Sequence, residues 1–421
     1  MTLKTRITTA IATGAVLLNA LAPAAFAVTT IEISGNGAGS DNWTTVNQNT
    51  TQTVTQNNAA KVTNNVNADA KTGGNDANFN TGGTVVIDTG DAKSKVNIAN
   101  DLNKNLAEVD CCQPGNTDVT ISGNGANSDN GVALGQAITT TVAQNNKAKV
   151  VNNVDADATT GYNDALKNTG GDVIVSTGNA VADVDVTTTA NVNAAKVGNN
   201  GTGGSNPSAT FVISGNGAGS DNYITAALTK VNTVAQNNSA YVNNNVDADA
   251  TTGKNDANFN TGGDVIIATG IAKVMADVNN AVNFNSADID CGCTWDVKAK
   301  IAGNGADEDR GFLDFLFGDK NIIKLDLTSA QIIGQGNRSN LNNQLYDLDA
   351  KTGKNDLNSN TGSVEGGDPA ILTGDATIES GVSNSGNVNV VGNFLPFELP
   401  EMPHFEFSFN FAALWAFFNL G

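Results

Sequence analysis

An internal repeat is the feature that most limits how this chain can fold. The motif Ile-Ser-Gly-Asn-Gly-Ala starts at Ile33, Ile121 and Ile213, and it returns as Ile-Ala-Gly-Asn-Gly-Ala at Ile301, with spacings of 88, 92 and 88 residues. Two more markers keep the same order: Thr-Gly-x-Asn-Asp starts at Thr72, Thr160, Thr252 and Thr352, and Asn-Thr-Gly starts at Asn80, Asn168, Asn260 and Asn360. Four ordered copies of three markers indicate an architecture in which each unit packs on the next.

Within each copy the side chains alternate with a period of two. Along 148–158, Ala, Val and Asn residues occupy every second position, with charged, polar or valine residues between them, and 180–194 alternates in the same way. Alternation of this kind predicts β-strands with one buried face. Because the inward residues are small, we expect the facing layers to lie close together.

Thr-Gly pairs interrupt these strands at regular distances. Thr72 and Thr89 are 17 residues apart, and the second and third copies repeat this spacing. Glycine supplies the positive φ of a tight corner. We interpret 17 residues as one rung of a solenoid, which predicts about five rungs per copy, each stacked about 4.8 Å from the next.

The predicted fold class is therefore all-β: a β-solenoid of four imperfect repeats of ~88 residues. A string of separate β-sandwiches of about 90 residues is the alternative. Aromatic residues make up only 5% of the chain. A single copy so poor in large apolar residues cannot form a stable core by itself, whereas stacked copies bury one another's faces.

The N-terminus has the pattern of a secretory signal peptide. Lys4 and Arg6 precede an apolar stretch from Ile7 to Leu21, and Ala25-Phe26-Ala27 supplies small residues for cleavage after Ala27. We therefore expect a secreted, extracellular or cell-surface protein without a membrane span after cleavage. The predicted organisation is 1–27 signal peptide, 28–120 repeat 1, 121–212 repeat 2, 213–300 repeat 3, 301–392 repeat 4 with an apolar insertion, and 393–421 an aromatic cap or docking tail.

The cap assignment depends on two apolar segments near one end of the repeats. Half of the sixteen Phe residues lie from Phe394 onward, and the insertion at 311–322 in the fourth copy is also apolar. An open sheet edge recruits other chains, so a cover over the last rung is expected. Docking of the tail to a partner or a membrane surface is the alternative.

The charge of the chain restricts its partners. The formal net charge is −20, and loss of the signal peptide makes it −22, which argues against nucleic-acid binding. Asp155, Asp157, Asp247 and Asp249 form outward pairs at equivalent places, because residues two apart on a strand face the same side. Such pairs are candidate calcium ligands. A solvated acidic face is the alternative, and no other cofactor is predicted.

The sequence contains almost none of the residue combinations that form catalytic sites. The single histidine, His404, lies in the aromatic tail, so no Ser-His-Asp or Cys-His arrangement can be assembled. We predict that the protein is not an enzyme. Some β-helical enzymes act on polysaccharides with clustered carboxylates, which keeps a polysaccharide-acting enzyme as the weakest alternative.

Two cysteine pairs, Cys111-Cys112 and Cys291-Gly292-Cys293, occupy equivalent places two copies apart. Ten rungs of about 4.8 Å would separate them by about 50 Å, too far for a disulfide between the pairs. Local bridges, free thiols and links between molecules remain.

The segments Gln144–Val154 and Gln236–Val246, with the pattern Gln-Asn-Asn-x-Ala-x-Val-x-Asn-Asn-Val, resemble the repeats of curlin-type amyloid subunits. The full repeat is similar to secreted Asn/Gly-rich repeat proteins of candidate-phyla bacteria. The curlin resemblance implies stacked strands that form extracellular fibres and hold biofilms together. We expect a cell-surface fibre, biofilm-matrix or adhesin component that acts by self-association or by binding cell-surface glycan or protein. A monomeric glycan- or cell-binding adhesin is the alternative function.

Overall fold

The computed structural model describes residues 29–109, 116–198, 208–291, 295–305, 320–362 and 369–392. These residues form strands and connecting turns without a helix. The predicted signal peptide, most of the apolar insertion and the predicted cap at 393–421 lie outside the described residues.

Each repeat contributes four strands to the fold. The first repeat forms β1 (Thr29–Ser34), β2 (Asp41–Lys71), β3 (Val85–Thr89) and β4 (Ala92–Val109). The second and third repeats form the same set: β5 (Thr117–Ser122), β6 (Asp129–Thr159), β7 (Val173–Thr177), β8 (Ala180–Gly198), β9 (Ser208–Ser214), β10 (Asp221–Thr251), β11 (Val265–Thr269) and β12 (Ala272–Asp290). The fourth repeat forms β13 (Asp296–Ala302), β14 (Asn321–Lys351), β15 (Ala370–Leu372) and β16 (Ala376–Val391).

Equivalent strands of the four repeats pair with one another. They form four parallel four-stranded sheets with the orders β1-β5-β9-β13, β2-β6-β10-β14, β3-β7-β11-β15 and β4-β8-β12-β16. The pairing is in register, so that Asn64 lies beside Asn152 and Asn152 beside Asn244. The predicted all-β solenoid of four repeats is confirmed.

The predicted number of rungs is wrong, because each repeat forms a single large coil. The long strand β6 alone has 31 residues, which span about 100 Å. The Thr-Gly pairs do not mark successive rungs. Thr72 and Thr89 both belong to one end of the same coil, where the Thr72 hydroxyl donates to the Gly90 carbonyl oxygen at 2.8 Å. Separate β-sandwiches are also excluded, since every sheet contains strands from all four repeats.

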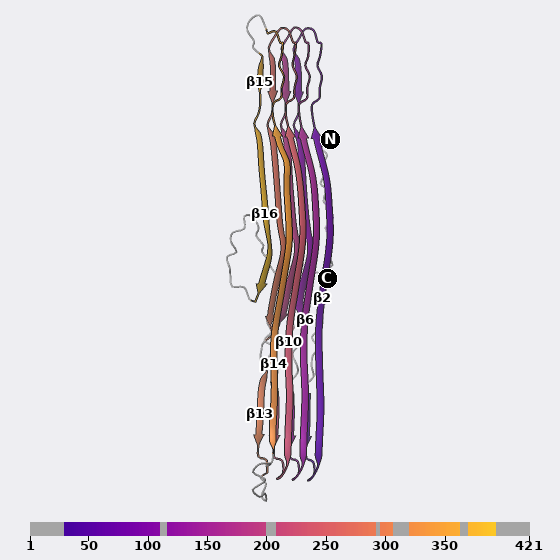
Figure 1. Ribbon diagram of the computed structural model, residues 1–421, viewed down its shortest axis with the longest axis vertical. Coiled ribbons are helices and arrows are strands. Elements are labelled where there is room, and N and C mark those ends of the chain that lie inside the picture. The colour runs from indigo at the N-terminus through magenta and orange to yellow at the C-terminus, as the bar shows by residue number, and fades with distance from the viewer. Residues whose placement is uncertain are drawn as a thin grey trace.

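The coils are long and flat, and they lie side by side like a stack of narrow loops (Figure 1). One layer is the sheet of the long strands β2, β6, β10 and β14. The other layer is made end to end by the three shorter sheets, with β15 at one end, β16 in the middle and β13 at the other end (Figure 1).

The narrow core between the layers alternates apolar clusters with rows of amides. Val154, Ala156 and Ala158 of the long sheet pack against Ala182 and its neighbours on β8. Beside this apolar cluster the core contains Asn and Gln side chains, which donate hydrogen bonds to the equivalent side chains of neighbouring coils. The sequence predicted the inward positions along 148–158 and 180–190 correctly, including the inward asparagines. Its alternation is wrong at Val192 and Ala194, because Asn191 also turns inward, and after it Asn193, Ala195 and Val197 face the core.

The amide rows also hold the two layers together. Gln144 Nε2 donates to Gln56 Oε1 in the neighbouring coil at 2.7 Å and to the Ala194 carbonyl oxygen of the facing sheet at 3.0 Å. Asn191 of β8 has a φ of 64°, which turns its side chain into the core between the two layers. Its Nδ2 donates to Asn283 Oδ1 at 2.9 Å. Buried amides are therefore paired both along the stack and across it.

The cysteine distances must also be corrected. With one coil per repeat, equivalent positions of the first and third coils are about 10 Å apart instead of about 50 Å. This separation is only a few ångströms longer than the Cα distance of about 7 Å that a disulfide allows, so the exclusion of a bridge between the two pairs no longer holds. Cys291 is buried and disulfide-bonded, and its partner lies outside the described residues.

Candidate functional site

The acidic columns lie on the outer face of the long sheet. Asp155 and Asp157 of β6 pair in register with Asp247 and Asp249 of β10, so the four predicted metal-binding residues do come together. Asn67 and Asp69 extend the two columns onto β2. Ala156 and Ala248 alternate with these residues and are fully buried, which confirms that the aspartates point outward.

Burial and mutual repulsion shift the protonation of these aspartates. Burial raises the pKa of Asp247 to about 6, and the charges of Asp249 and Asp155 add to the shift. The pKa of Asp157 and the pKa of Asp249 are also raised, in both cases mainly by burial. One carboxylate oxygen of Asp249, Oδ1, is buried without a hydrogen-bond partner among the described residues. The parallel in-register strands therefore hold like charges close together, which costs free energy, and bound protons or cations can reduce this repulsion.

Within the described ranges, no group of three or more His, Cys, Asp or Glu residues is arranged to hold a metal ion. The aspartates form columns along the sheet and do not surround a common position at which a metal ion could bind. Calcium binding at Asp155, Asp157, Asp247 and Asp249 therefore stays a prediction.

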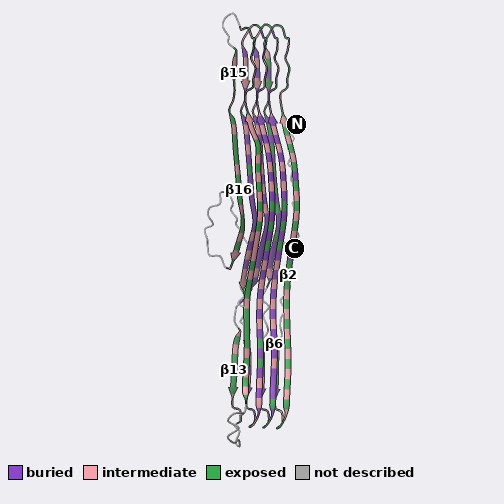
Figure 2. Cartoon of the chain, viewed as in Figure 1, coloured by how far each residue is buried: buried purple, intermediate pink, exposed green. Residues whose placement is uncertain are grey.

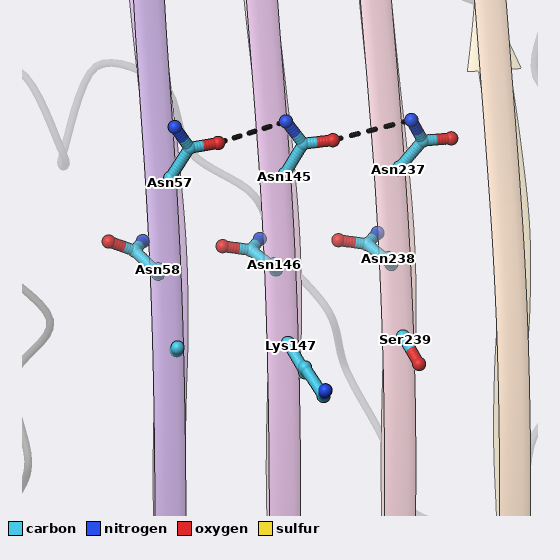
Figure 3. Close-up of a pocket in the computed structure, with 9 residues that line it drawn as sticks. Asn57, Asn58, Asn145, Asn146, Lys147, Asn237, Asn238 and Ser239 are labelled. Carbon is cyan, nitrogen blue, oxygen red and sulfur yellow. Dashed lines mark hydrogen bonds between the residues drawn. The ribbon is translucent and has the colours of Figure 1, made fainter.

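A shallow depression of ≈ 310 Å³ lies near the middle of the long sheet. Asn57, Asn145 and Asn237 cross it in a row, and their amides bond to one another (Figure 3). The other lining residues are Asn58, Ala59, Asn146, Lys147, Asn238 and Ser239. The lining offers amides, the Ser239 hydroxyl and the Lys147 ammonium group but no carboxylate, imidazole or thiol, so it supplies no pair of groups for acid–base chemistry.

Aromatic side chains stand on the outer surface, and the sequence reasoning missed them as a group. Trp43 is 68% exposed and lies over Gly131, where an added Cβ would come within 2.0 Å of its ring. Phe79 is 70% exposed, and the Lys167 ammonium lies 5.1 Å from its ring centre. For Trp43 the signal in the sequence was an aromatic residue at an outward position of the period-two pattern, whereas Phe79 lies in the connection between β2 and β3, outside that pattern.

The two ends of the stack differ from its middle. In Figure 2 the long strands β6 and β10 of the central coils alternate mostly between purple and pink, whereas β2 and β14 of the first and last coils alternate mostly between green and pink. Val274 of the third coil is fully buried, whereas Ile378, which is in register with it on the fourth coil, is 48% exposed. Each end presents a row of strand edges, which are surfaces that can accept another strand.

Comparisons with known proteins identify no relative: no family model, no curated protein and no solved structure matches this chain. Among the described residues there is also no helix with the length and apolarity that a bilayer crossing requires.

Proposed function

We propose that this protein is a secreted structural protein that builds a cell-surface fibre or biofilm matrix by stacking its coils on those of other copies. The observation that carries the proposal is the in-register parallel pairing of all four coils, with the pattern of the amide rows continued into both terminal coils. Stacked parallel in-register strands with Asn and Gln rows are also the means by which cross-β fibres gain stability. The resemblance to curlin-type repeats supports the same function.

Catalysis is not part of this proposal. The depression on the long sheet is lined mainly by amides, and the only histidine, His404, belongs to the C-terminal tail. The negative charge of the chain disfavours nucleic acid as a partner. The strand edges at the two ends of the stack fit other copies of the same chain best.

Negative-stain imaging and fibre diffraction of the purified chain from residue 28 onward test the proposal. We expect unbranched fibres with a strong axial spacing of about 4.8 Å and a length of about 19 Å per chain. A protein that stays monomeric at high concentration and that gives no such spacing would contradict the structural function.

A second candidate function is the binding of cell-surface glycans. It is favoured by the exposed rings of Trp43 and Phe79 on the outer surface, because sugar rings stack on exposed aromatic side chains. A glycan array probed with the monomer tests this function. Binding that is lost in Trp43→Ala or Phe79→Ala would support it, and an empty array would count against it.

A further inference from the structure

We infer that copies of this chain join head to tail, with the first coil of one copy docking in register on the fourth coil of another. This inference rests on the proposed function and specifies the interface. Three independent observations carry it: the polarity of the amide rows, the charges on the two end coils and a glycine that the isolated chain does not need.

The buried amide rows have a direction. Asn103 Nδ2 donates to Asn191 Oδ1, Asn191 to Asn283 and Asn283 to Asn387, each at 2.9 Å. Within each step the same nitrogen also donates to a facing backbone carbonyl oxygen at 2.8 Å, as Asn103 does to Lys147. The first coil thus ends the row with the Oδ1 acceptor of Asn103. The fourth coil ends it with the Nδ2 donor of Asn387, which in the isolated chain donates to Ser339 Oγ at 2.9 Å.

Only a head-to-tail joint continues this direction. In that joint Asn387 would donate to Asn103 of the next copy and to the backbone carbonyl of Ala59, which is the residue in register with Lys147. The Gln row runs in the opposite sense, since Gln236 donates to Gln144 and Gln144 to Gln56, and it too is continued only head to tail. Two first coils facing each other would pair acceptors with acceptors in the Asn row and donors with donors in the Gln row. A head-to-tail interface does not close on itself and so produces an open filament.

The two end coils carry opposite charges at equivalent places. The in-register pairing places Glu32, Thr120, Val212 and Lys300 in one column. Asp41, Asp129 and Asp221 form a second column, which ends beside Lys320, whose backbone N–H donates to Asp221 Oδ1. Head-to-tail docking therefore brings Lys300 against Glu32 and Lys320 against Asp41. All four side chains are exposed in the isolated chain.

A third column adds an opposite pair, because Lys95, Asp183, Met275 and Glu379 are in register. Other columns would bring like charges together, among them Asp76 with Asp356, Asp69 with Asp349 and Lys71 with Lys351. The last two columns lie two residues apart on the same strands. These charges alternate along each strand, so each lysine also lies diagonally beside an aspartate of the other copy. The chain already tolerates stacked aspartates, as Asp157 and Asp249 show.

Gly90 is the third observation. Its counterparts Gly178, Gly270 and Gly374 pack so tightly on the coil before them that an added Cβ would come within 2.4–2.7 Å of backbone atoms. Gly90 belongs to the first coil, its φ is outside the left-handed region, and an added Cβ would meet nothing within 4 Å. Docking on a fourth coil would place Gly374 of the other copy against Gly90 and would give this position the same need for glycine.

A charge-swap series tests the interface. One variant, Glu32→Lys with Asp41→Lys, makes both ends basic at these columns, and the other, Lys300→Glu with Lys320→Glu, makes both ends acidic. We expect each variant alone to raise the critical concentration for assembly roughly tenfold, since several exposed pairs turn from attraction to repulsion. An equimolar mixture should assemble again, because basic ends then meet acidic ends alternately. Asp118→Lys with Asp129→Lys, in the second coil, is the control with the same charge change and should assemble like the wild type.

Gly90→Ala tests the same joint sterically. We expect its monomer to melt at the wild-type temperature and its assembly to be blocked, since the methyl group would collide with Gly374 of the other copy. Carbodiimide cross-linking of the wild-type fibres gives a measurement without any variant. It should join Glu32 to Lys300 between molecules, as mixing isotopically labelled and unlabelled chains would reveal, because within one chain three coil steps of about 4.8 Å separate them.

The outcomes separate the inference from the proposed function. If the wild type forms no fibres, the structural function fails and the inference fails with it. If the wild type forms fibres, but the swap variants and Gly90→Ala assemble as well as it does and Glu32 is not cross-linked to Lys300, only the head-to-tail joint is wrong. Fibres then form through another surface, such as the outer sheet face or the C-terminal tail.

Discussion

The side-chain amide of Asn152 donates from Nδ2 to Oδ1 of Asn244 at 2.6 Å, although 92 residues separate the two along the chain. Asn152 also accepts from Asn64 at 2.7 Å. Both Asn152 and Asn244 are fully buried between the two layers. Each coil therefore fixes the register of the next through side chains as well as through the backbone, because a shift by one residue would leave these amides without partners.

We predict that Asn152→Ala destabilises the protein by about 1–3 kcal/mol, because it leaves the amides of Asn64 and Asn244 buried without their partner. Urea unfolding of the monomer measures the change. Asn153→Ala is the matched control. Asn153 also joins a row, with Asn65 and Asn245, but on the outer face, and its loss should cost less than about 0.5 kcal/mol. Equal effects at the two positions would contradict the role assigned to the inner row.

Gly178→Ala should be strongly destabilising, whereas Gly90→Ala should be tolerated by the monomer. The two glycines are equivalent, but a Cβ at Gly178 would lie 2.6 Å from the Gly90 carbonyl carbon, while one at Gly90 meets nothing within 4 Å. Forcing backbones apart in a packed stack costs about 1–3 kcal/mol or more. Thermal melting of both variants decides this, and a Gly178→Ala protein as stable as the wild type would mean that the coils are packed more loosely than described.

The sequence was sufficient to predict the strands, the stacking of four repeats and most of the inward faces, although the alternation predicted for 180–194 fails after Ala190, where Asn191 also turns inward. Alternation along 148–158 identified Asn152 and Val154 as inward, and both are buried. The length of the coil was not predictable in the same way. A Thr-Gly pair looks alike whether it ends a rung or joins two strands of one layer, as Thr89 does between β3 and β4. Only pairing between residues about 90 positions apart distinguishes these cases.

That error in coil length determined how much of the candidate site could be predicted. The sequence placed Asp155 and Asp247 at equivalent outward positions. With five rungs per repeat they would stand about 24 Å apart. With one coil per repeat they are direct neighbours in the sheet, which explains why they repel one another. The inner Asn rows were missed for the same reason, since their hydrogen bonds exist only if equivalent residues of successive repeats touch.

We predict that acidification from pH 7 toward pH 4 stabilises the fold through the acidic columns. The pKa of Asp247 is raised in the folded protein to about 6 from an ordinary value of 3.8. A raised carboxyl pKa means that this group favours folding fully below the unfolded value and that the contribution is lost as pH rises through about 6. The melting temperature should therefore increase as the pH falls through this window.

Asp247→Asn tests the assignment, because it removes the titrating group while it keeps the size of the side chain. The variant should melt at a higher temperature than the wild type at pH 7 and should show a flatter pH dependence between pH 7 and pH 4. Asp88→Asn, an exposed aspartate on β3, is the control and should leave the pH dependence unchanged. A wild-type melting temperature that falls steadily on acidification would show that other groups dominate.

Calcium should act at most as a stabiliser of the same columns. A bound cation reduces the repulsion among Asp155, Asp157, Asp247 and Asp249, and binding to the folded state raises stability by mass action. We expect millimolar calcium to raise the melting temperature by a few degrees at pH 7, and we expect a chelator to reverse the shift without unfolding the protein. In Asp155→Asn/Asp247→Asn the shift should disappear. An unchanged melting temperature in the wild type would leave only a solvated acidic face.

The last prediction concerns Cys291. This residue is disulfide-bonded and 2% exposed, and it packs with Val197 and Ala287 at the end of the third coil. The bridge should therefore resist mild reductants and alkylation in the native protein, and it should be reduced readily after unfolding. Mass mapping under non-reducing conditions identifies the partner.

The identity of the partner sets the contribution of the bridge to stability. A link to Cys293 closes a loop of a few residues, and its loss should change the stability little. A link to Cys111 or Cys112 closes a loop of about 180 residues, and its loss should cost several kcal/mol in the chain-entropy estimate. Comparison of Cys291→Ser with the reduced wild type by urea unfolding checks the magnitude, and native labelling of Cys291 by iodoacetamide without prior reduction would contradict the bridge itself.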